Sequence, residues 1–95
     1  MYTSLVSVEI TEVKVFPVAD NEQLKAFVRI TLSDAFVIRD LKVIRNADGD
    51  FFVAMPTRKD KRGIHHDIAH PINPETRERI EKIILGAYFA FVNGS

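Results

Sequence analysis

Four cationic side chains crowd one short stretch in the middle of the chain. The run consists of Arg58, Lys59, Lys61 and Arg62. Only Asp60 interrupts it, and Gly63 follows as a position where the chain can turn. Lys and Arg in this density can neutralise phosphates, and Arg can also reach the edges of bases. The segment therefore predicts a loop that binds a polyanion, although a merely solvated charged loop is the alternative that the charges leave open.

Two further arginines stand at the beginning of a predicted helix. Asn73 can accept a hydrogen bond from an orphan N–H, and Pro74 at the first helical position loses no bond. Arg77 and Arg79 add positive charge to the positive end of the helix dipole, which slightly opposes helix stability. One interpretation is phosphate capture beside the basic loop and the sheet edge, which we expect to lie close together. Pairing with glutamates of the same turns is the other interpretation.

Three histidines and one aspartate raise the question of a metal site. In an extended segment His66 and His70 point to one side, whereas His65 and Asp67 point to the other. Catalytic zinc needs three convergent protein ligands, so this separation predicts no metal site. We expect Asp67 and His70 instead to satisfy backbone groups at the corner made by Pro71. A metal-dependent hydrolase built on the histidines remains a remote alternative.

The residue inventory offers little to an enzyme. The chain of 95 residues has no cysteine, which excludes disulfides and thiol nucleophiles, and it has no phosphate-binding glycine motif or serine nucleophile motif. We therefore expect no catalytic residues, no cofactor and no small-molecule substrate. No apolar run approaches the roughly 20 residues that span a bilayer, and the first residues lack a positively charged leader. The cytoplasm is the expected location.

Charge is balanced overall but unevenly distributed. The formal net charge is zero, with 13 Lys and Arg against 13 Asp and Glu. Residues 1–50 contain six cations and eight anions, whereas residues 51–95 contain seven cations and five anions. Any affinity for nucleic acid must therefore come from a local patch, and added salt should weaken it in proportion to the phosphates neutralised.

Hydrophobic periodicity predicts the elements that position these residues. Strands are predicted over residues 5–18, 24–33, 36–45 and 51–54. A change of apolar phase indicates a bulge near Thr11 and Glu12, and mixed faces in the third strand indicate a bend at Asp40 or burial on both sides. Asp48 and Gly49 form a hairpin turn signal. From Pro74 onward the period becomes helical.

The helical period defines one apolar stripe, composed of Ile80, Ile83, Ile84, Ala87, Tyr88 and Phe91. Glu81 is assigned to the opposite, polar face, and Gly86 is interpreted as a position of close packing against the sheet. Asn93 and Gly94 should end the helix. The predicted fold is a single α+β domain over residues 1–95, an antiparallel meander of four to five strands with one C-terminal α-helix packed on it. Surplus aromatic surface, including Phe27, predicts self-association.

Several strings resemble the SpoVG family, also called the septation protein family. FVAMPTRK and DIAHPINPETRERI carry most of the likeness, and ITEVKVFPV and LKAFVRITLSDAFVIRDLKVI stand upstream in the same order. The match extends from about Glu9 to Tyr88. The resemblance implies a bacterial regulator that binds DNA and RNA as a homodimer, influences septation, sporulation and gene expression, and catalyses no reaction.

The chain also departs from the family pattern within the basic segment. Relatives often have Thr-Pro-Asp where this chain has residues 60–62, so this loop is more basic. At His65 and His66 they commonly have an aromatic residue followed by Arg or Lys. We therefore expect nucleic-acid contacts from Arg58, Lys59, Lys61, Arg62 and His66, supported by Arg77 and Arg79. A protein-interaction module of cell division, without direct nucleic-acid binding, is the alternative function.

Overall fold

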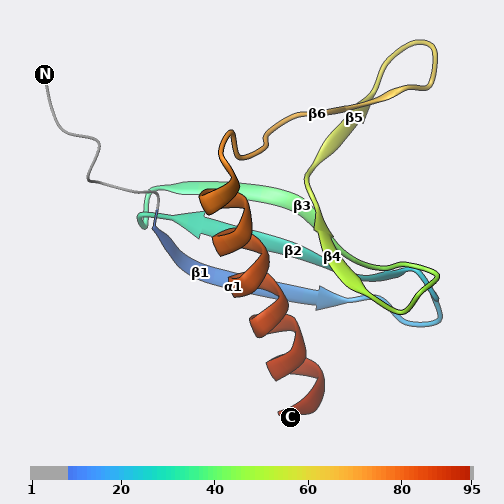
Figure 1. Ribbon diagram of the computed structural model, residues 1–95. Helices are drawn as coiled ribbons and strands as arrows, with labels where there is room; N and C mark the ends of the chain where they lie inside the picture. Colours follow the sequence, from blue (N-terminus) through green and yellow to red (C-terminus); the bar gives the residue numbers. More distant parts are fainter. Residues whose placement is uncertain (1–8, 95) are drawn as a thin grey trace, which may run out of the picture.

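The computed structural model describes residues 9–94 and shows two antiparallel sheets and one helix (Figure 1). The larger sheet contains β1 (Ile10–Pro17), β2 (Leu24–Leu32), β3 (Phe36–Arg45) and β4 (Phe51–Ala54). The smaller sheet pairs β5 (Thr57–Lys59) with β6 (His65–Asp67), and α1 covers Pro74–Asn93. Residues 5–8 of the first predicted strand lie outside the described residues.

The four-stranded sheet is a meander, because its strand order β1-β2-β3-β4 follows the sequence. Every neighbouring pair is antiparallel. The predicted α+β arrangement, an antiparallel meander with one C-terminal helix, is confirmed. Four to five strands were expected in the main sheet, and it contains four. The extended segments after β4 pair with each other and not with the main sheet.

Bulges in β1 and β3 explain why neither strand alternates evenly. The register between β1 and β2 shifts between Ile10 and Glu12, as the change of apolar phase predicted. In β3 the two residues Arg39 and Asp40 lie opposite the single β2 residue Arg29, and Asp40 has a φ of 65°. This bulge moves the core-facing positions from even to odd numbers, so the mixed parity of the third strand reflects a bend.

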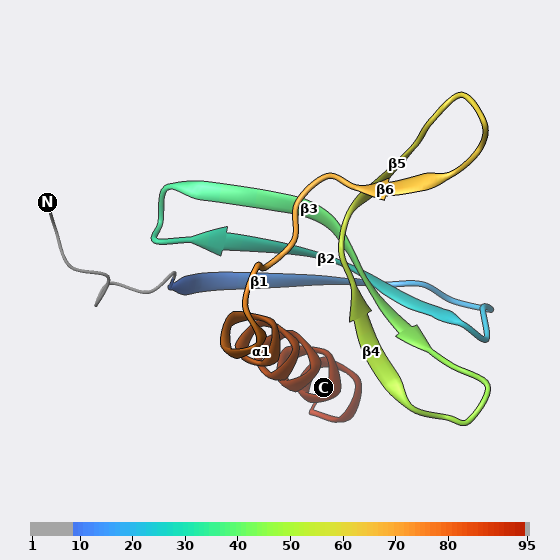
Figure 2. The same ribbon diagram turned by 45° about the horizontal axis from the view of Figure 1, so that its top comes forward.

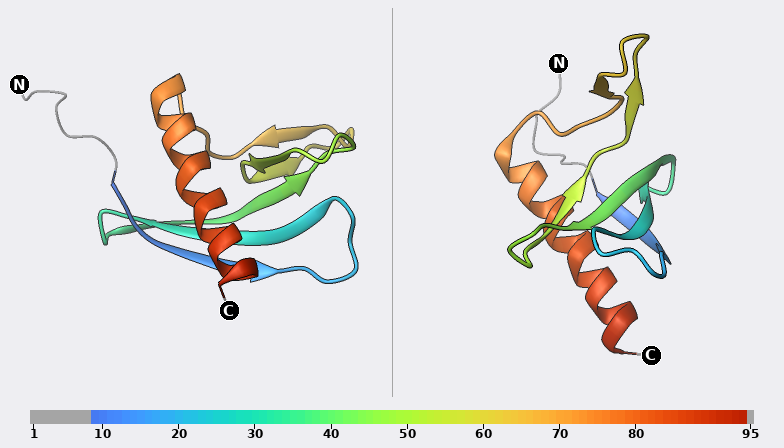
Figure 3. Two further views of the ribbon diagram at one scale, coloured as in Figure 1. Left: turned by 60° about the horizontal axis from the view of Figure 1, so that its bottom comes forward. Right: turned by 90° about the vertical axis from the view of Figure 1, so that its right-hand side faces the viewer.

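The hydrophobic core lies between one face of the sheet and α1 (Figure 3). Alternation along β2 and β3 directs small and branched side chains to this face, and the helical stripe closes over them. The buried residues that form this core are Ala26, Val28, Ile30, Leu41, Val43, Val53, Met55, Ile80, Ile84 and Tyr88. The opposite face of the sheet has no helix on it among the described residues.

Three expectations about the helix are wrong. Phe91 is exposed, because the stripe runs past the region where the helix lies on the sheet. Gly86 is also exposed, and a Cβ atom there would meet nothing within 4 Å, so close packing does not explain this glycine. Glu81 does not belong to the solvent face, since its carboxylate accepts a hydrogen bond of 3.3 Å from the backbone N–H of Val53. It ties the helix to β4.

An aromatic cluster closes the core beside β4. The ring centroid of Phe51 lies 5.0 Å from that of Phe89 in an edge-on arrangement and 6.0 Å from that of Tyr88. The edge-on geometry of Phe51 and Phe89 is preferred by aromatic pairs, because the positive ring edge meets the negative ring face. No helix among residues 9–94 is long and apolar enough to cross a membrane.

Candidate nucleic-acid interface

The basic segment forms a β-hairpin that projects from the main sheet, which we call the basic arm (residues 57–67). Its strands pair Thr57 with Asp67, Arg58 with His66 and Lys59 with His65. Met55 and Pro56 are buried where β4 ends, and the Pro56 carbonyl accepts a hydrogen bond of 2.8 Å from Ile68 at the base of the arm. The arm itself has no fully buried residue and therefore stands in solvent (Figure 1).

The tip of the basic arm is a tight turn organised by Asp60. The Asp60 carbonyl accepts from the N–H of Gly63 at 3.0 Å, and the Asp60 N–H donates to Ile64 at 2.9 Å. Oδ1 of the same aspartate accepts from the backbone N–H groups of Arg62 and Ile64, at 2.8 and 3.0 Å. Gly63 has a φ of 83°, a conformation that glycine adopts without steric cost. The turn therefore presents Lys61 and Arg62 at its outermost positions.

The β3–β4 hairpin has the same turn, with an asparagine in place of the aspartate. Asn46 Oδ1 accepts from the N–H groups of Asp48 and Asp50, both at 3.0 Å. Its backbone bonds to Gly49 and Asp50 repeat those of Asp60, and Gly49 has a φ of 89°. The shared pattern Asn or Asp, two residues, Gly was visible in the sequence. Without the hairpin register, Asp60 stands out in the sequence only as an interruption of the basic run.

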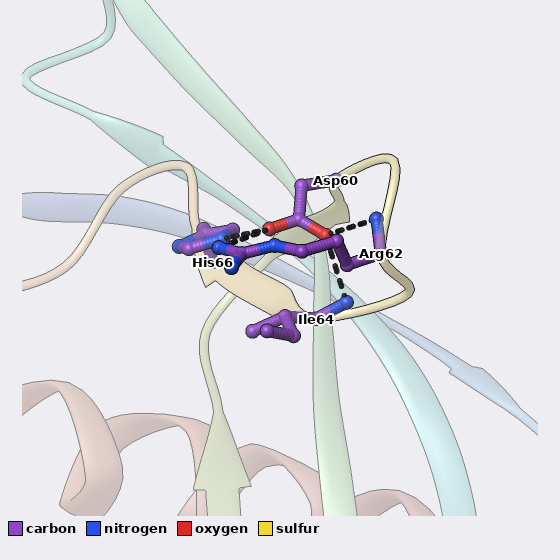
Figure 4. Close-up of polar contacts among 4 residues, drawn as sticks. All are labelled: Asp60, Arg62, Ile64 and His66. Atoms are coloured by element: carbon purple, nitrogen blue, oxygen red, sulfur yellow. Dashed lines mark hydrogen bonds and ion pairs between the residues drawn. The ribbon is translucent and has the colours of Figure 1, made fainter.

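The second carboxylate oxygen of Asp60 faces the His66 ring and the Arg62 guanidinium (Figure 4). Its Oδ2 lies 2.8 Å from Nε2 of His66 and 3.7 Å from the guanidinium of Arg62. The bond to His66, followed by the backbone N–H of Ile64, holds the pKa of Asp60 below its usual value of 3.8. The tip is thus stabilised while Asp60 is ionised, and this contribution is lost as pH falls through the lowered pKa.

The structure brings five of the seven predicted contact residues together. Arg58, Lys59, Lys61, Arg62 and His66 all belong to the basic arm, and all are exposed. Figures 1 and 2 show the tip projecting away from the N-terminal end of α1, where Arg77 and Arg79 are placed. The expectation that basic loop, sheet edge and helix N-terminus lie close together is therefore wrong for the tip.

The residues between the basic arm and the helix act structurally. Asn73 caps α1, accepting a hydrogen bond of 2.8 Å from Thr76 N–H, and Pro74 follows at the first position, as predicted. His70 Nδ1 lies 3.0 Å from the Pro71 carbonyl oxygen and donates to it, which confirms its role at the corner. Asp67 is different, because its exposed side chain lies on β6 opposite Thr57. Within residues 9–94, no three His, Cys, Asp or Glu side chains are grouped to hold a metal ion.

Replacing Asp60 by asparagine should keep the turn and strengthen anion binding. Asn46 shows that an amide oxygen accepts the same two backbone bonds, while the substitution raises the net charge of the arm by one. We expect Asp60→Asn to bind duplex DNA about two- to fivefold more tightly at 0.1 M salt. As Asp60 titrates in the parent protein, the amide resonances of Arg62 and Ile64 should shift with a midpoint below the usual 3.8, and they should stay constant in the variant.

The matched variant Asp60→Ala removes both the charge and the acceptor. It should gain the same positive charge but lose the hydrogen bonds to Arg62 and Ile64. Amide hydrogen exchange at these two positions should be faster in Asp60→Ala but not in Asp60→Asn. This result would distinguish the role of Asp60 in holding the turn from the effect of its negative charge. Equal exchange in both variants would contradict the role assigned to the side-chain oxygen.

The comparison with protein families covers most of the residues that form the strands, the arm and the capped helix. The SpoVG family profile matches residues 8–90, which include the whole meander, the basic arm and most of α1. The chain belongs to the SpoVG family. The likeness predicted from about Glu9 to Tyr88 is found over residues 8–90, and the predicted family membership is confirmed.

Curated SpoVG proteins from several bacteria are similar over most of this chain. A relative from Anaeromyxobacter sp. strain Fw109-5 is 60% identical over 80 residues, which cover 84% of this chain and 80% of the relative. One from Bdellovibrio bacteriovorus is 58% identical, covering 84% and 72%, and one from Myxococcus xanthus is 54% identical, covering 83% and 78%. All three bear the provisional name of septation protein SpoVG.

Proposed function

We propose that this SpoVG-family chain is a regulatory protein that binds nucleic acid through its basic arm and takes part in septation or sporulation. It acts as a homodimer in the cytoplasm and catalyses no reaction. Two copies present two arms, whose separation sets a spacing along the bound strand. The provisional names of its relatives connect the family with septation.

The observation that carries this proposal is the concentration of exposed cations on a projecting hairpin. Arg58, Lys59, Lys61 and Arg62 lie within one hairpin that buries almost nothing, and Asp60 is the one carboxylate at its tip. Exposed charges repel one another in the free protein and release counterions when they meet phosphates. A hairpin that contributes no side chain to the core is better explained by such a contact than by the stability of the fold.

A gel shift with mixed-sequence DNA and RNA across a salt series tests the proposal. Binding should weaken linearly in log Kd against log salt, with a slope of about 0.9 per phosphate contacted on duplex DNA and about 0.7 on a single strand. Four cations on each arm predict a slope of about 3 to 4 per chain. Failure to bind either nucleic acid at 50 mM salt would disprove the proposal.

Binding should also be tighter at pH 6 than at pH 8, because His66 lies in the basic arm where the family resemblance implies a permanent cation. Histidine side chains generally gain a proton over this range, which adds a positive charge to the arm as pH falls. We expect a two- to fivefold difference in Kd, abolished in His66→Asn. Identical affinities at the two pH values and equal ionic strength would rule this role out.

A protein-interaction module is the second candidate function. It is favoured by exposed isoleucines that flank the basic arm, since Ile68 is 66% and Ile72 is 89% exposed. Apolar side chains left in water beside a charged hairpin are typical of a surface that another protein covers. Loss of a partner from Ile68→Ser with unchanged affinity for nucleic acid would distinguish this function from the first.

A further inference from the structure

The open face of the main sheet combines exposed aromatic rings with cations. Phe16 on β1 pairs with Phe27 on β2, which pairs with Lys42 on β3, and these side chains alternate with the buried residues of the core face. In the next row Lys14 pairs with Arg29. Figures 2 and 3 show α1 on the other face, so this row of rings and charges faces solvent in one chain.

The rings are too exposed to act as core residues. Phe16 is 47% exposed and Phe27 is 37% exposed, although both lie within regular strands. The guanidinium of Arg29 lies 5.7 Å from the ring centroid of Phe16, within the range of a cation–π contact. A shallow hollow of about 190 Å³ adjoins the two rings, lined by Phe16, Phe27, Val28, Arg29, Arg39 and Asp40.

We infer that this face is a stacking platform for single-stranded nucleic acid, a second contact surface that rests on the proposed function and extends it. Bases of an extended strand stack on aromatic side chains, whichever base is present, while nearby Lys and Arg follow the phosphates. Phe16 and Phe27 supply the ring faces, and Lys14, Arg29 and Lys42 supply the charges. The basic arm, by contrast, contacts phosphates without requiring unpaired bases.

Charge complementarity favours a polyanion over a second copy of the chain on this surface. The cations on this surface are Lys14, Arg29, Arg39 and Lys42. Its acidic residues are Asp40 and, one row further, Glu12, whose carboxylate accepts a hydrogen bond of 3.4 Å from Thr31 Oγ1. Stacking two such faces about a twofold axis would bring cations against cations, which costs binding energy. A duplex is also disfavoured, because its bases are already stacked and cannot lie on the rings.

The test compares two probes, a fluorescein-labelled 20-residue oligouridine and a 20-base-pair mixed-sequence DNA duplex. The double variant Phe16→Ala/Phe27→Ala should raise the Kd for oligouridine at least tenfold and leave the Kd for the duplex within twofold. Phe91→Ala is the matched control, because this phenylalanine is 51% exposed but lies on the helix. Unchanged oligouridine affinity in the double variant would overturn the inference.

A tryptophan reporter tests the contact without removing the ring. The chain has no tryptophan, so Phe27→Trp introduces a single indole. Oligouridine should bind this variant as tightly as the parent protein and quench the indole emission, whereas the duplex should not quench it. An indole that does not respond to bound oligouridine would reject the platform even if the alanine variant were unstable.

The outcomes separate this inference from the proposed function. If neutralising the basic arm weakens duplex binding while Phe16→Ala/Phe27→Ala leaves oligouridine binding intact, the proposed function stands and the platform fails. If oligouridine binding depends on the rings but neutralising the basic arm leaves duplex binding unchanged, the platform is supported and the role proposed for the arm is rejected. A changed mass by light scattering in Phe16→Ala/Phe27→Ala, with both affinities unchanged, would make the face an interface between copies and reject the platform.

Discussion

Replacing Lys61 and Arg62 together by serine is expected to weaken duplex DNA binding by about 60-fold at 0.1 M salt. Each phosphate contact contributes about 0.9 to the slope of log affinity against log salt, so two lost contacts remove about 1.8 from the slope per chain. Between 0.1 M and a 1 M reference, this slope corresponds to nearly two powers of ten. The measurement is fluorescence anisotropy of a labelled duplex at five or more salt concentrations.

The geometry of the tip makes this variant informative. Lys61 and Arg62 occupy the two outer positions of the turn, while its hydrogen bonds are made by Asp60, the backbone N–H groups and Gly63. Serine is well tolerated in turns, and Arg62 loses only an exposed ion pair of 3.7 Å with Asp60, which contributes little to stability. The fold should therefore remain intact, as judged by an unchanged circular dichroism spectrum and an unchanged mass.

The double variant Arg45→Ser/Lys82→Ser is the matched control. It removes the same number of charges from exposed positions at the end of β3 and on α1, outside the basic arm. A change in overall charge alone would weaken binding equally in both variants. Equal losses would therefore show that a diffuse field, and not the arm, attracts the nucleic acid.

The sequence predicted the fold well wherever a local signal and the tertiary packing agreed. Asn73 and Pro74 began the helix as predicted, because capping depends on residues close in the chain. The bend at Asp40 was visible as mixed parity, although the bulge itself became clear only from the register with β2. Phe91 and Glu81 were misassigned, because periodicity does not reveal where the helix leaves the sheet or which strand end lies beside it.

The candidate site was predicted in its residues but not in its arrangement. Charge density identified the basic run, since each cation was visible in the sequence. Neither the pairing of Arg58 with His66 nor the bond from His66 to Asp60 follows from composition, because both require the register of a hairpin. The rings of Phe16 and Phe27 are separated by a turn and meet only through the pairing of β1 with β2.

Replacing Ile84 by alanine is expected to lower the free energy of unfolding by about 2–5 kcal/mol. Ile84 is fully buried in the centre of the helical stripe, within the core cluster that the helix shares with the sheet. Truncation removes buried methyl and methylene groups and leaves a cavity that the surrounding strands fill only in part. This loss is a large fraction of the 5–15 kcal/mol by which a domain of this size is typically stable.

Urea denaturation of Ile84→Ala and Ile72→Ala at one protein concentration measures this effect against a matched control. Ile72 has the same side chain but is 89% exposed, so its truncation should change the free energy of unfolding by no more than about 0.5 kcal/mol. Holding the concentration constant matters, because self-association would otherwise contribute to the apparent stability.

The basic arm follows β4, and the hydrogen bond between Pro56 and Ile68 closes its base. Ile84→Ala should therefore still bind nucleic acid at temperatures where it remains folded. Similar destabilisation by the two substitutions would mean that α1 does not cover the sheet along the stripe centred on Ile84.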